Sequence, residues 1–248
     1  GNVNNTSYVF SISENITRTF AETASGDFIA SFNDIEIYEG TYLTKQFTYD
    51  GSLDQRFIIN NSSLDTSTLT VYVKGENEEG LGIQYFPVDN IINVNSNSQI
   101  YLLQEVQDEQ YQLLFGDGLI GKKLGTGVNN DGNIITANYI ISNGKDGNGA
   151  KVFNFAGNLT YPIRSGDSLI DTKVTQGISL LTTSQSSQNG DNIESLDNVK
   201  YLAPRVYASQ FRAVTANDYT SLVPSVYPNI ESVTAYGGEE LDPPQYGK

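Results

Sequence analysis

The sequence predicts a mainly β fold, with antiparallel and mixed sheets, that ends in a small α+β part. Two observations carry this prediction. Short apolar–polar alternating runs, separated by Gly, Asn, Asp and Ser, recur along the chain before Asn192 and are typical of strands joined by turns. Helix signals occur only after that point, in two short segments.

The first of these segments predicts a helix over residues 192–203, with apolar residues at roughly helical spacing. They are Ile193, Leu196, Val199 and Ala203. We expect the helix to end at Pro204, because a proline ring disfavours helical geometry at the residue before it. Residues 205–213 contain aromatic residues and arginines but no turn residue, so they are predicted to be extended and packed.

The second segment predicts a helix over residues 215–223. Thr215 stands at an N-cap position, and Asp218, three residues on, can act as the acidic partner of a capping box. Pro224 is expected to stop this helix, for the same reason that Pro204 stops the first.

Among the strands, residues 69–74 alternate most cleanly, which predicts a sheet with one solvent-facing side. Residues 133–142 carry apolar side chains on both faces and are predicted to form a central strand covered on both sides. Residues 100–106 and 111–115 are predicted to form a hairpin. Further strands are expected at residues 8–13, 18–21, 28–32, 35–38, 44–49, 56–60, 84–88, 151–155 and 169–183.

We place a domain boundary near Gly157, which gives a β-rich domain of residues 1–156 and an α+β domain of residues 157–248. The first 40 residues are expected to form a separate arm or a sheet edge. The chain contains no Met and begins with Gly1, and its last residues have the composition of a loop. We therefore expect a piece of a longer protein, with the α+β domain truncated at its C-terminal end.

Composition excludes several classes of function. The formal net charge is −15, and nucleic-acid binding requires an excess of Lys and Arg on one face. No apolar run approaches the ~18 residues of a membrane span. The chain has no Cys and no His, so disulfides, thiol chemistry, His-dependent triads and His-containing zinc sites are excluded. We expect no catalytic, cofactor-binding or metal-binding residue, and no nucleic-acid, membrane or small-molecule partner.

Residues 116–123 (GDGLIGKK) satisfy two nucleotide-binding patterns, G-x-x-x-x-G-K and G-x-G-x-x-G. Both patterns require a helix that begins at the glycines, and the first also requires Ser or Thr after the lysine. Lys123 stands there, and helix-hostile glycines follow. We interpret the segment as a turn in which Gly116 and Gly118 adopt positive φ and Asp117 accepts backbone hydrogen bonds.

Other polar groups are interpreted in the same way. The Asn/Asp/Gly segments 129–133 and 146–149 lack the spaced ligands of an EF-hand loop, so we favour ordinary turns over calcium sites. The acidic clusters at residues 76–79 and 105–109 are interpreted as solvated turns, with contact to basic patches on neighbouring subunits as the alternative.

Two arginines stand among apolar residues seven positions apart, Arg205 and Arg212. Either their stems pack over aromatic rings with the guanidinium groups in water, or they form bidentate ion pairs with carboxylates of the fold or of a neighbouring subunit. Sequence alone leaves both readings open.

Two further functions stay open. With 29 acidic residues, a carboxylate pair of the glycosidase type is available, although the sequence singles none out. The 16 Tyr residues could also stack against sugars in a surface groove, in a carbohydrate-binding or host-adhesion module. Such residues more often fill sheets and anchor interfaces.

Residues 203–240 (APRVYASQFRAVTANDYTSLVPSVYPNIESVTAYGGEE) resemble the closing segment of baseplate J-like proteins, which belong to contractile phage tails. That segment has a proline-ended helix, Arg-Ala-Val-Thr, Asp-Tyr, a Tyr/Phe-Pro turn and a Val-rich strand, the last at residues 232–236 here. Earlier matches are residues 64–73 and a Phe-Gly-Asp-Gly element followed by spaced glycines. These stand at Phe115–Gly118, Gly121, Gly127, Tyr139, Gly144 and Gly147-Asn148.

The resemblance covers roughly residues 40–238 and implies a structural protein rather than an enzyme. It implies a wedge component of a tail baseplate, in the ring around the tail tube, that is assembled in the host cytoplasm and becomes part of the virion. Implied partners are a second copy of the chain, as a homodimer, and other wedge proteins. It also implies that some interfaces rearrange when the tail contracts. The family's usual proline after Gly121 is replaced by Lys123-Leu124.

Overall fold

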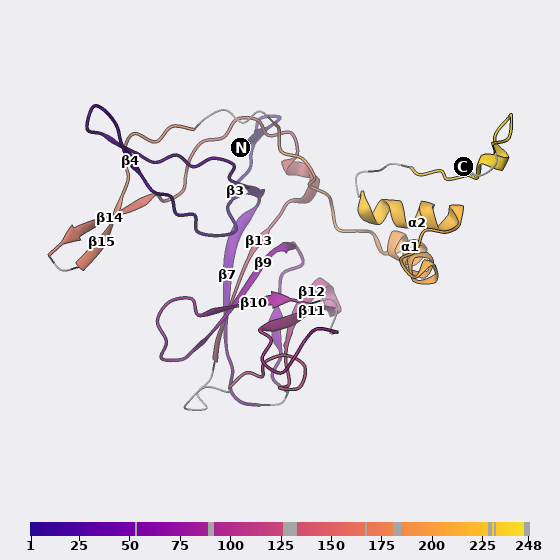
Figure 1. The fold of residues 1–248 in the computed structure, drawn as a ribbon, viewed down its shortest axis with the longest axis horizontal. Helices are drawn as coiled ribbons and strands as arrows, with labels where there is room; N and C mark the ends of the chain where they lie inside the picture. The colour runs from indigo at the N-terminus through magenta and orange to yellow at the C-terminus, as the bar shows by residue number, and fades with distance from the viewer. Residues whose placement is uncertain are drawn as a thin grey trace. The chain divides into compact units, whose positions relative to one another are not determined.

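The computed structural model describes residues 1–52, 54–88, 92–125, 133–166, 168–180, 185–227, 230 and 232–245. The chain divides into two compact units (Figure 1). The first unit comprises residues 1–143 and 150–183, and the second comprises residues 144–149 and 184–248. The domain boundary expected near Gly157 stays a prediction.

A seven-stranded sheet dominates the first unit. In spatial order its strands are β7 (Thr41–Thr48), β13 (Asn133–Ile141), β9 (Leu64–Gly75), β10 (Ile83–Pro87), β11 (Ile100–Val106), β12 (Gln110–Phe115) and β8 (Phe57–Ile59). Neighbours are antiparallel except β10 and β11, which are parallel. The mainly β fold with a mixed sheet is confirmed. The predicted hairpin is also confirmed as β11 and β12, joined by a 3-10 turn (Gln107–Glu109).

The two ends of this sheet approach each other across its interior. Phe47 of β7 packs edge-on against Phe57 of β8, with 5.7 Å between ring centroids. Phe57 packs in turn against Phe115 of β12 at 5.5 Å, and Phe115 against Tyr85 of β10 at 5.8 Å. Edge-to-face aromatic pairs are favourable beyond the area that they bury, so these rings hold the curved sheet together.

Strand β13 is the most buried element of the sheet. It lies between β7 and β9, as Figure 1 shows, and pairs with both. Every residue from Ile135 to Ile140 is buried. The predicted central, doubly covered strand is therefore confirmed.

Strand β9 shows the alternation that its sequence predicts. Leu69, Val71 and Val73 point into the core and are at most 7% exposed. Thr70 and Tyr72 lie on the opposite, outer face, opposite Asn138 and Thr136 of β13. The outer face of β7, β13 and β9 is polar, since Thr44 and Gln46 of β7 also face it.

A β-bulge interrupts the pairing of β13 and β9 between Asn138 and Ile140. The buried Thr68 hydroxyl accepts the Ile140 N–H at 3.0 Å and donates to the Asp65 carbonyl at 2.8 Å. Asp65 Oδ1 accepts the N–H and the hydroxyl of Ser67. The Asp-Thr-Ser-Thr sequence thus supplies hydrogen-bond partners for backbone groups that the bulge leaves unpaired.

The first 40 residues form short ladders instead of the longer strands predicted there. Their elements are β1 (Asn2–Val3), β2 (Thr6–Ser7), β3 (Phe10–Ser11), β4 (Ala21–Glu22), β5 (Phe28–Ile29) and β6 (Tyr38–Glu39), paired β1–β2, β3–β6 and β4–β5. Gly40 joins them to the sheet with φ +133°, and a Cβ there would lie 2.2 Å from the Ile141 carbonyl oxygen. Glycine is required at this junction for both reasons.

The last strands of the first unit are β14 (Thr160–Ser165) and β15 (Ser168–Lys173), which pair with each other. The sequence did not predict β14. Of the predicted strand 169–183, residues 169–173 lie in β15, residues 174–180 form no strand, and residues 181–183 lie outside the described residues. Residues 151–155 form no strand, contrary to prediction. Phe153 of this segment packs edge-on against Phe10 of β3 without any ladder pairing.

The second unit contains the helices α1 (Leu196–Ser209) and α2 (Ala216–Val226) and the 3-10 turns η2 (Gly144–Gly147) and η3 (Gly238–Glu240). Both helices were predicted, but their boundaries were wrong. Pro204 and Pro224 lie inside them, and residues 205–209 are helical rather than extended. A proline removes one donor but leaves the later N–H groups free to bond. Accordingly, Tyr227 N–H donates to the Val223 carbonyl across Pro224.

Candidate interaction surface

Side-chain caps fix where both helices begin. Ser195 accepts the Asn198 N–H at the start of α1. At the start of α2 the predicted capping box is present, because Thr215 accepts the Asp218 N–H and Asp218 accepts the Thr215 N–H at 2.8 Å. The pKa of Asp218 is lowered, mainly by the hydrogen bond from the Thr215 N–H and next by the interaction with the Thr215 hydroxyl.

The buried side chains of the two helices, among the described residues, are serines. Ser209 of α1 and Ser221 of α2 are 6% and 3% exposed, and each hydroxyl donates to a carbonyl of its own helix. In the described part of the second unit, no apolar side chain is buried. Leu202, Val206, Leu222 and Val223 are only partly buried, so the described part of the helix pair has no fully enclosed apolar interior.

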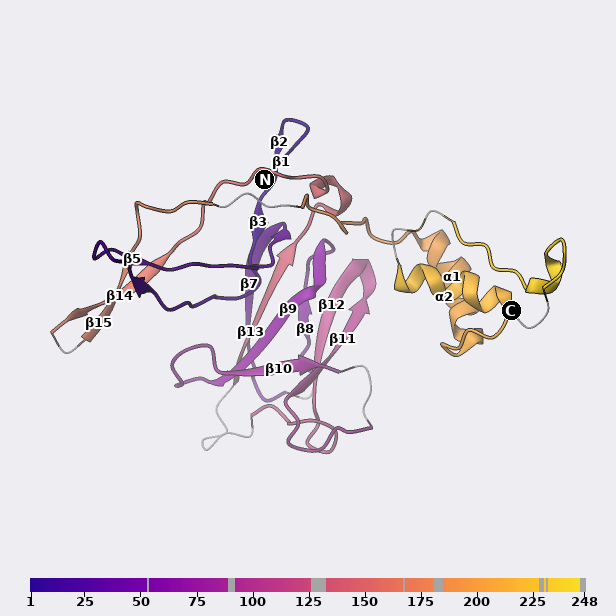
Figure 2. The same ribbon diagram turned by 45° about the horizontal axis from the view of Figure 1, so that its top comes forward.

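Several large apolar side chains of the second unit are exposed instead. Figure 2 labels the helices α1 and α2, which carry or adjoin these residues. The most exposed of them lie at the end of α1 and in the link to α2: Tyr207 at 85%, Phe211 at 82% and Val214 at 78%. We call these three residues the α1–α2 surface. Others with more than half of their surface exposed are Ile193, Leu196, Tyr201, Val226, Tyr227 and Tyr236. Apolar surface of this extent marks a contact site for other proteins.

The hairpin β14–β15 presents a second apolar face. Its register places Ile163 opposite Ile170 and Tyr161 opposite Thr172, so these four side chains share one face. Ile163, Ile170 and Tyr161 are 43%, 53% and 43% exposed. An isolated two-stranded hairpin is marginally stable in water, so this face suits packing against another protein.

The two arginines singled out by the sequence donate their hydrogen bonds to uncharged groups. Arg205 lies 3.7 Å from the centre of the Tyr201 ring, one turn earlier on α1, and donates to the Tyr201 carbonyl. Arg212 donates to Gln210 Oε1 at 2.8 Å and adds a favourable charge interaction with Asp218. Neither interpretation describes Arg205 fully, because its guanidinium group, rather than its stem, lies over the ring and donates to a carbonyl.

The glycine-rich segment 116–123 is a tight turn, and no helix follows it among the described residues. Asp117 Oδ1 accepts the N–H groups of Ile120 and Leu119 at 2.9 and 2.8 Å, which lowers the pKa of Asp117. Gly118 has a positive φ of 94°, as predicted. Gly116 does not, and it requires glycine because a Cβ there would lie 2.2 Å from the Gly121 carbonyl carbon.

The remaining candidate sites contribute little. Among the described residues, no group of three Asp or Glu side chains could hold a metal ion, and no helix is long and apolar enough to cross a membrane. Segment 146–149 begins within the η2 turn. Most of segment 129–133 lies outside the described residues. Residues 232–236 form no strand, contrary to the pattern implied by the resemblance.

Sequence reasoning missed the α1–α2 surface. It predicted residues 205–213 to be packed, whereas Tyr207 and Phe211 are among the most exposed apolar residues of the chain. No helical spacing signalled it, because α1 ends at Ser209 and Phe211 lies beyond that end with a φ of +56°.

A curved β unit combined with helices that expose their apolar residues defines a protein that works through contacts with other proteins. Residues 215–248, which begin at the N-cap of α2, match the family described as "Baseplate structural protein gp6, C-terminal domain I". The chain is also 24% identical over 202 residues to baseplate wedge protein gp6 of Enterobacteria phage T4. That alignment covers 77% of this chain and 28% of the relative, so the chain spans less than a third of the relative's length. Together these similarities support a relationship to the structural wedge proteins of phage baseplates.

Proposed function

We propose that this chain is a structural component of a phage tail baseplate wedge. The α1–α2 surface is the observation that carries the proposal, because the second unit has no buried apolar side chain among its described residues while Tyr207 and Phe211 are exposed. The similarity to a baseplate structural family begins at Thr215, directly after this surface. A unit of this kind gains stability by covering its apolar residues with another subunit.

In this proposal the chain makes contacts between subunits in the ring around the tail tube, with a second copy of itself in a homodimer and with other wedge proteins. It is assembled in the host cytoplasm and retained in the virion. The baseplate J-like resemblance further supports a role in rearrangement on contraction, for which some interfaces must have two stable arrangements.

The proposal assigns no reaction to the chain. The turn that resembles a nucleotide-binding loop has its own local bonds, and Asp117 is occupied by two backbone N–H groups. A glycosidase would require a positioned pair of carboxylates, and no observation singles out such a pair.

The test replaces one residue of the α1–α2 surface and measures self-association. Sedimentation velocity over a range of concentrations should show association of the natural chain, and Phe211→Ser should weaken it about tenfold, as expected for an exposed aromatic anchor. Phe86→Ser is the matched control, because Phe86 is an exposed phenylalanine of β10 in the first unit, 56% exposed. Its association should equal that of the natural chain.

A second measurement addresses the partners. Copurification with the other wedge proteins of the same phage, co-expressed in one host, should retain this chain and lose it on Phe211→Ser. A chain that stays monomeric up to ~100 μM, a concentration that weak complexes still populate, and that binds no wedge protein would refute the proposed function.

A further inference from the structure

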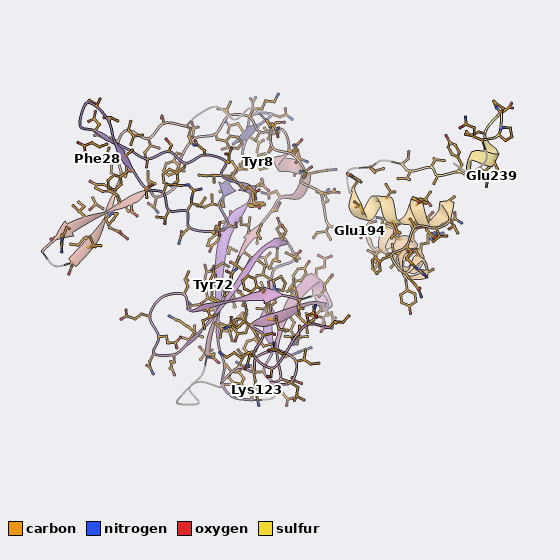
Figure 3. All side chains as sticks on the ribbon, viewed as in Figure 1. Tyr8, Phe28, Tyr72, Lys123, Glu194 and Glu239 are labelled. Atoms are coloured by element: carbon orange, nitrogen blue, oxygen red, sulfur yellow. The ribbon has the colours of Figure 1, made fainter. Side chains whose placement is uncertain are left out.

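A groove lies on the outer face of the sheet in the first unit, remote in sequence from the α1–α2 surface. It has a volume of about 210 Å³. Its floor is formed by Tyr42 of β7, Asn138 of β13, and Thr70 and Tyr72 of β9. Figure 3 labels Tyr72 on this part of the sheet. Residues 13–15 and Leu81 complete the wall.

Backbone contacts tie the wall to the floor. Residues 13–15 follow β3, which pairs with β6 directly before β7. The Ser11 hydroxyl donates to the Gly40 carbonyl at 2.8 Å, and the Gly40 N–H donates to the Val9 carbonyl at 2.9 Å. The segment that forms the wall therefore emerges from a fixed point beside Tyr42.

Asn138 supplies an unused hydrogen-bond donor at the floor. Asn138 is only 5% exposed, and its Oδ1 accepts a hydrogen bond from the Thr44 hydroxyl at 2.8 Å. Because the amide oxygen is directed at Thr44 of β7, the amide NH₂ points away from Thr44. This NH₂ has no hydrogen-bond partner among the described residues. Every fully buried polar side-chain atom of those residues has a partner, so the NH₂ must be partly accessible to solvent.

Two tyrosines flank this donor. Both line the groove, Tyr42 is 39% exposed, and the pKa of Tyr42 is raised by burial and, to a lesser extent, by Tyr72. The hydroxyls of Tyr42, Tyr72 and Thr70 form no hydrogen bond within the described part of the chain. The groove thus combines aromatic rings with several uncommitted neutral polar groups.

We propose that this groove binds one neutral sugar ring of a glycan. Aromatic rings pack against the C–H faces of a sugar, while an amide and hydroxyls hydrogen-bond its hydroxyl groups. The lining carries no Lys or Arg and has Glu14 on its wall, so it disfavours anionic ligands. Its volume is below the ~300–1,000 Å³ of sites for drug-sized ligands and suits a single ring.

A peptide strand fits this site less well. Strand addition requires free backbone groups at a sheet edge, whereas β13 beneath the groove already pairs with both β7 and β9. Recognition at the groove must therefore use side chains, which is how proteins bind sugars on a sheet face.

The test is binding of the full chain to an array of neutral and acidic oligosaccharides built from hexoses and N-acetylhexosamines. Saturation-transfer NMR then gives the affinity for the best neutral member. We expect a neutral glycan to bind, and Tyr42→Ala and Tyr72→Ala each to weaken it at least about fivefold. Tyr72→Phe, which keeps the ring, should weaken it less. Tyr161→Ala on β14 is the control, since Tyr161 is 43% exposed outside the groove, and it should change nothing.

The proposal is overturned if no neutral glycan binds at ~10 mM, a concentration that detects even weak sites. It is equally overturned if only acidic glycans bind, or if both alanine variants bind as well as the natural chain. Circular dichroism of each variant establishes that the sheet is folded. Self-association measured with Phe211→Ser is unaffected by these outcomes, so the sugar site and the proposed structural role fail separately.

Discussion

The sheet of the first unit and the helix pair of the second unit use their apolar residues in opposite ways. In β13, the consecutive residues Ile135 to Ile140 are all buried, because strands β7 and β9 flank them and other side chains cover both faces. In the described parts of α1 and α2, the buried residues are serines, whereas Tyr207 of α1 and Phe211 in the link to α2 are exposed.

This difference separates stability from function. The sheet buries its apolar side chains and pairs its backbone groups within the unit. Substitutions in it therefore lower the free energy of unfolding of the chain itself. The helices leave that surface uncovered, so their aromatic residues contribute little to the isolated chain and more to a complex with another subunit.

The largest effect should come from the middle of the sheet. Ile135→Ala removes a side chain that is 0% exposed and leaves a cavity, so it should lower the free energy of unfolding by about 2–5 kcal/mol. Urea denaturation monitors the change. Ile193→Ala is the comparison in the second unit, at 62% exposed, and should change the value by no more than ~0.5 kcal/mol. Equal costs would contradict the contrast between the two units.

The junction at Gly40 should show the next largest effect. Gly40→Ala imposes both an unfavourable φ of +133° and a clash with the Ile141 carbonyl, so we expect a loss on the order of 3 kcal/mol. Gly51→Ala shares the positive φ, at +81°, but has nothing within 4 Å of the added Cβ. It should cost roughly 1–2 kcal/mol. If urea denaturation shows the same loss of unfolding free energy for both substitutions, the close approach of Gly40 to β13 does not contribute to the cost.

Alkaline pH should weaken the sheet through Tyr101. Burial raises the pKa of Tyr101 to about 12, and the side chain is 2% exposed. Its contribution is fully present below pH 10, where the tyrosine is protonated in both states, and is lost as the pH rises towards 12. Between these values the natural chain should lose on the order of 1–3 kcal/mol more stability than Tyr101→Phe. Urea denaturation at pH 9, 10 and 11 measures the difference, and identical pH profiles would refute it.

The smallest effect should come from the cap of α2. Thr215→Ala removes the hydroxyl that accepts the Asp218 N–H and should raise amide exchange in residues 216–226 by about five- to tenfold, equivalent to ~1 kcal/mol. Hydrogen-exchange mass spectrometry follows these residues in the full chain. Thr220→Ala, within the same helix, should leave exchange nearly unchanged. A rise confined to Thr220→Ala would contradict the role of the capping box.

Much of the fold followed from local sequence patterns. The alternation of residues 69–74, the doubly apolar run at 133–142 and the Thr215–Asp218 cap each have a period or spacing that fixes the local backbone. The structure has each of them as predicted. The helix ends were wrong, because Pro204 and Pro224 cost one donor each and the following residues continue the hydrogen bonding.

By itself, then, the sequence determined the strands of the seven-stranded sheet, the N-cap of α2, and that no His- or Cys-based chemistry is available. Only the tertiary structure decided which apolar residues are covered. It also determined that Gly40 meets Ile141 and that Tyr42, Tyr72 and Asn138 share one groove. The physical reason is that periodicity acts within a few residues, whereas burial and juxtaposition depend on which distant strands pair.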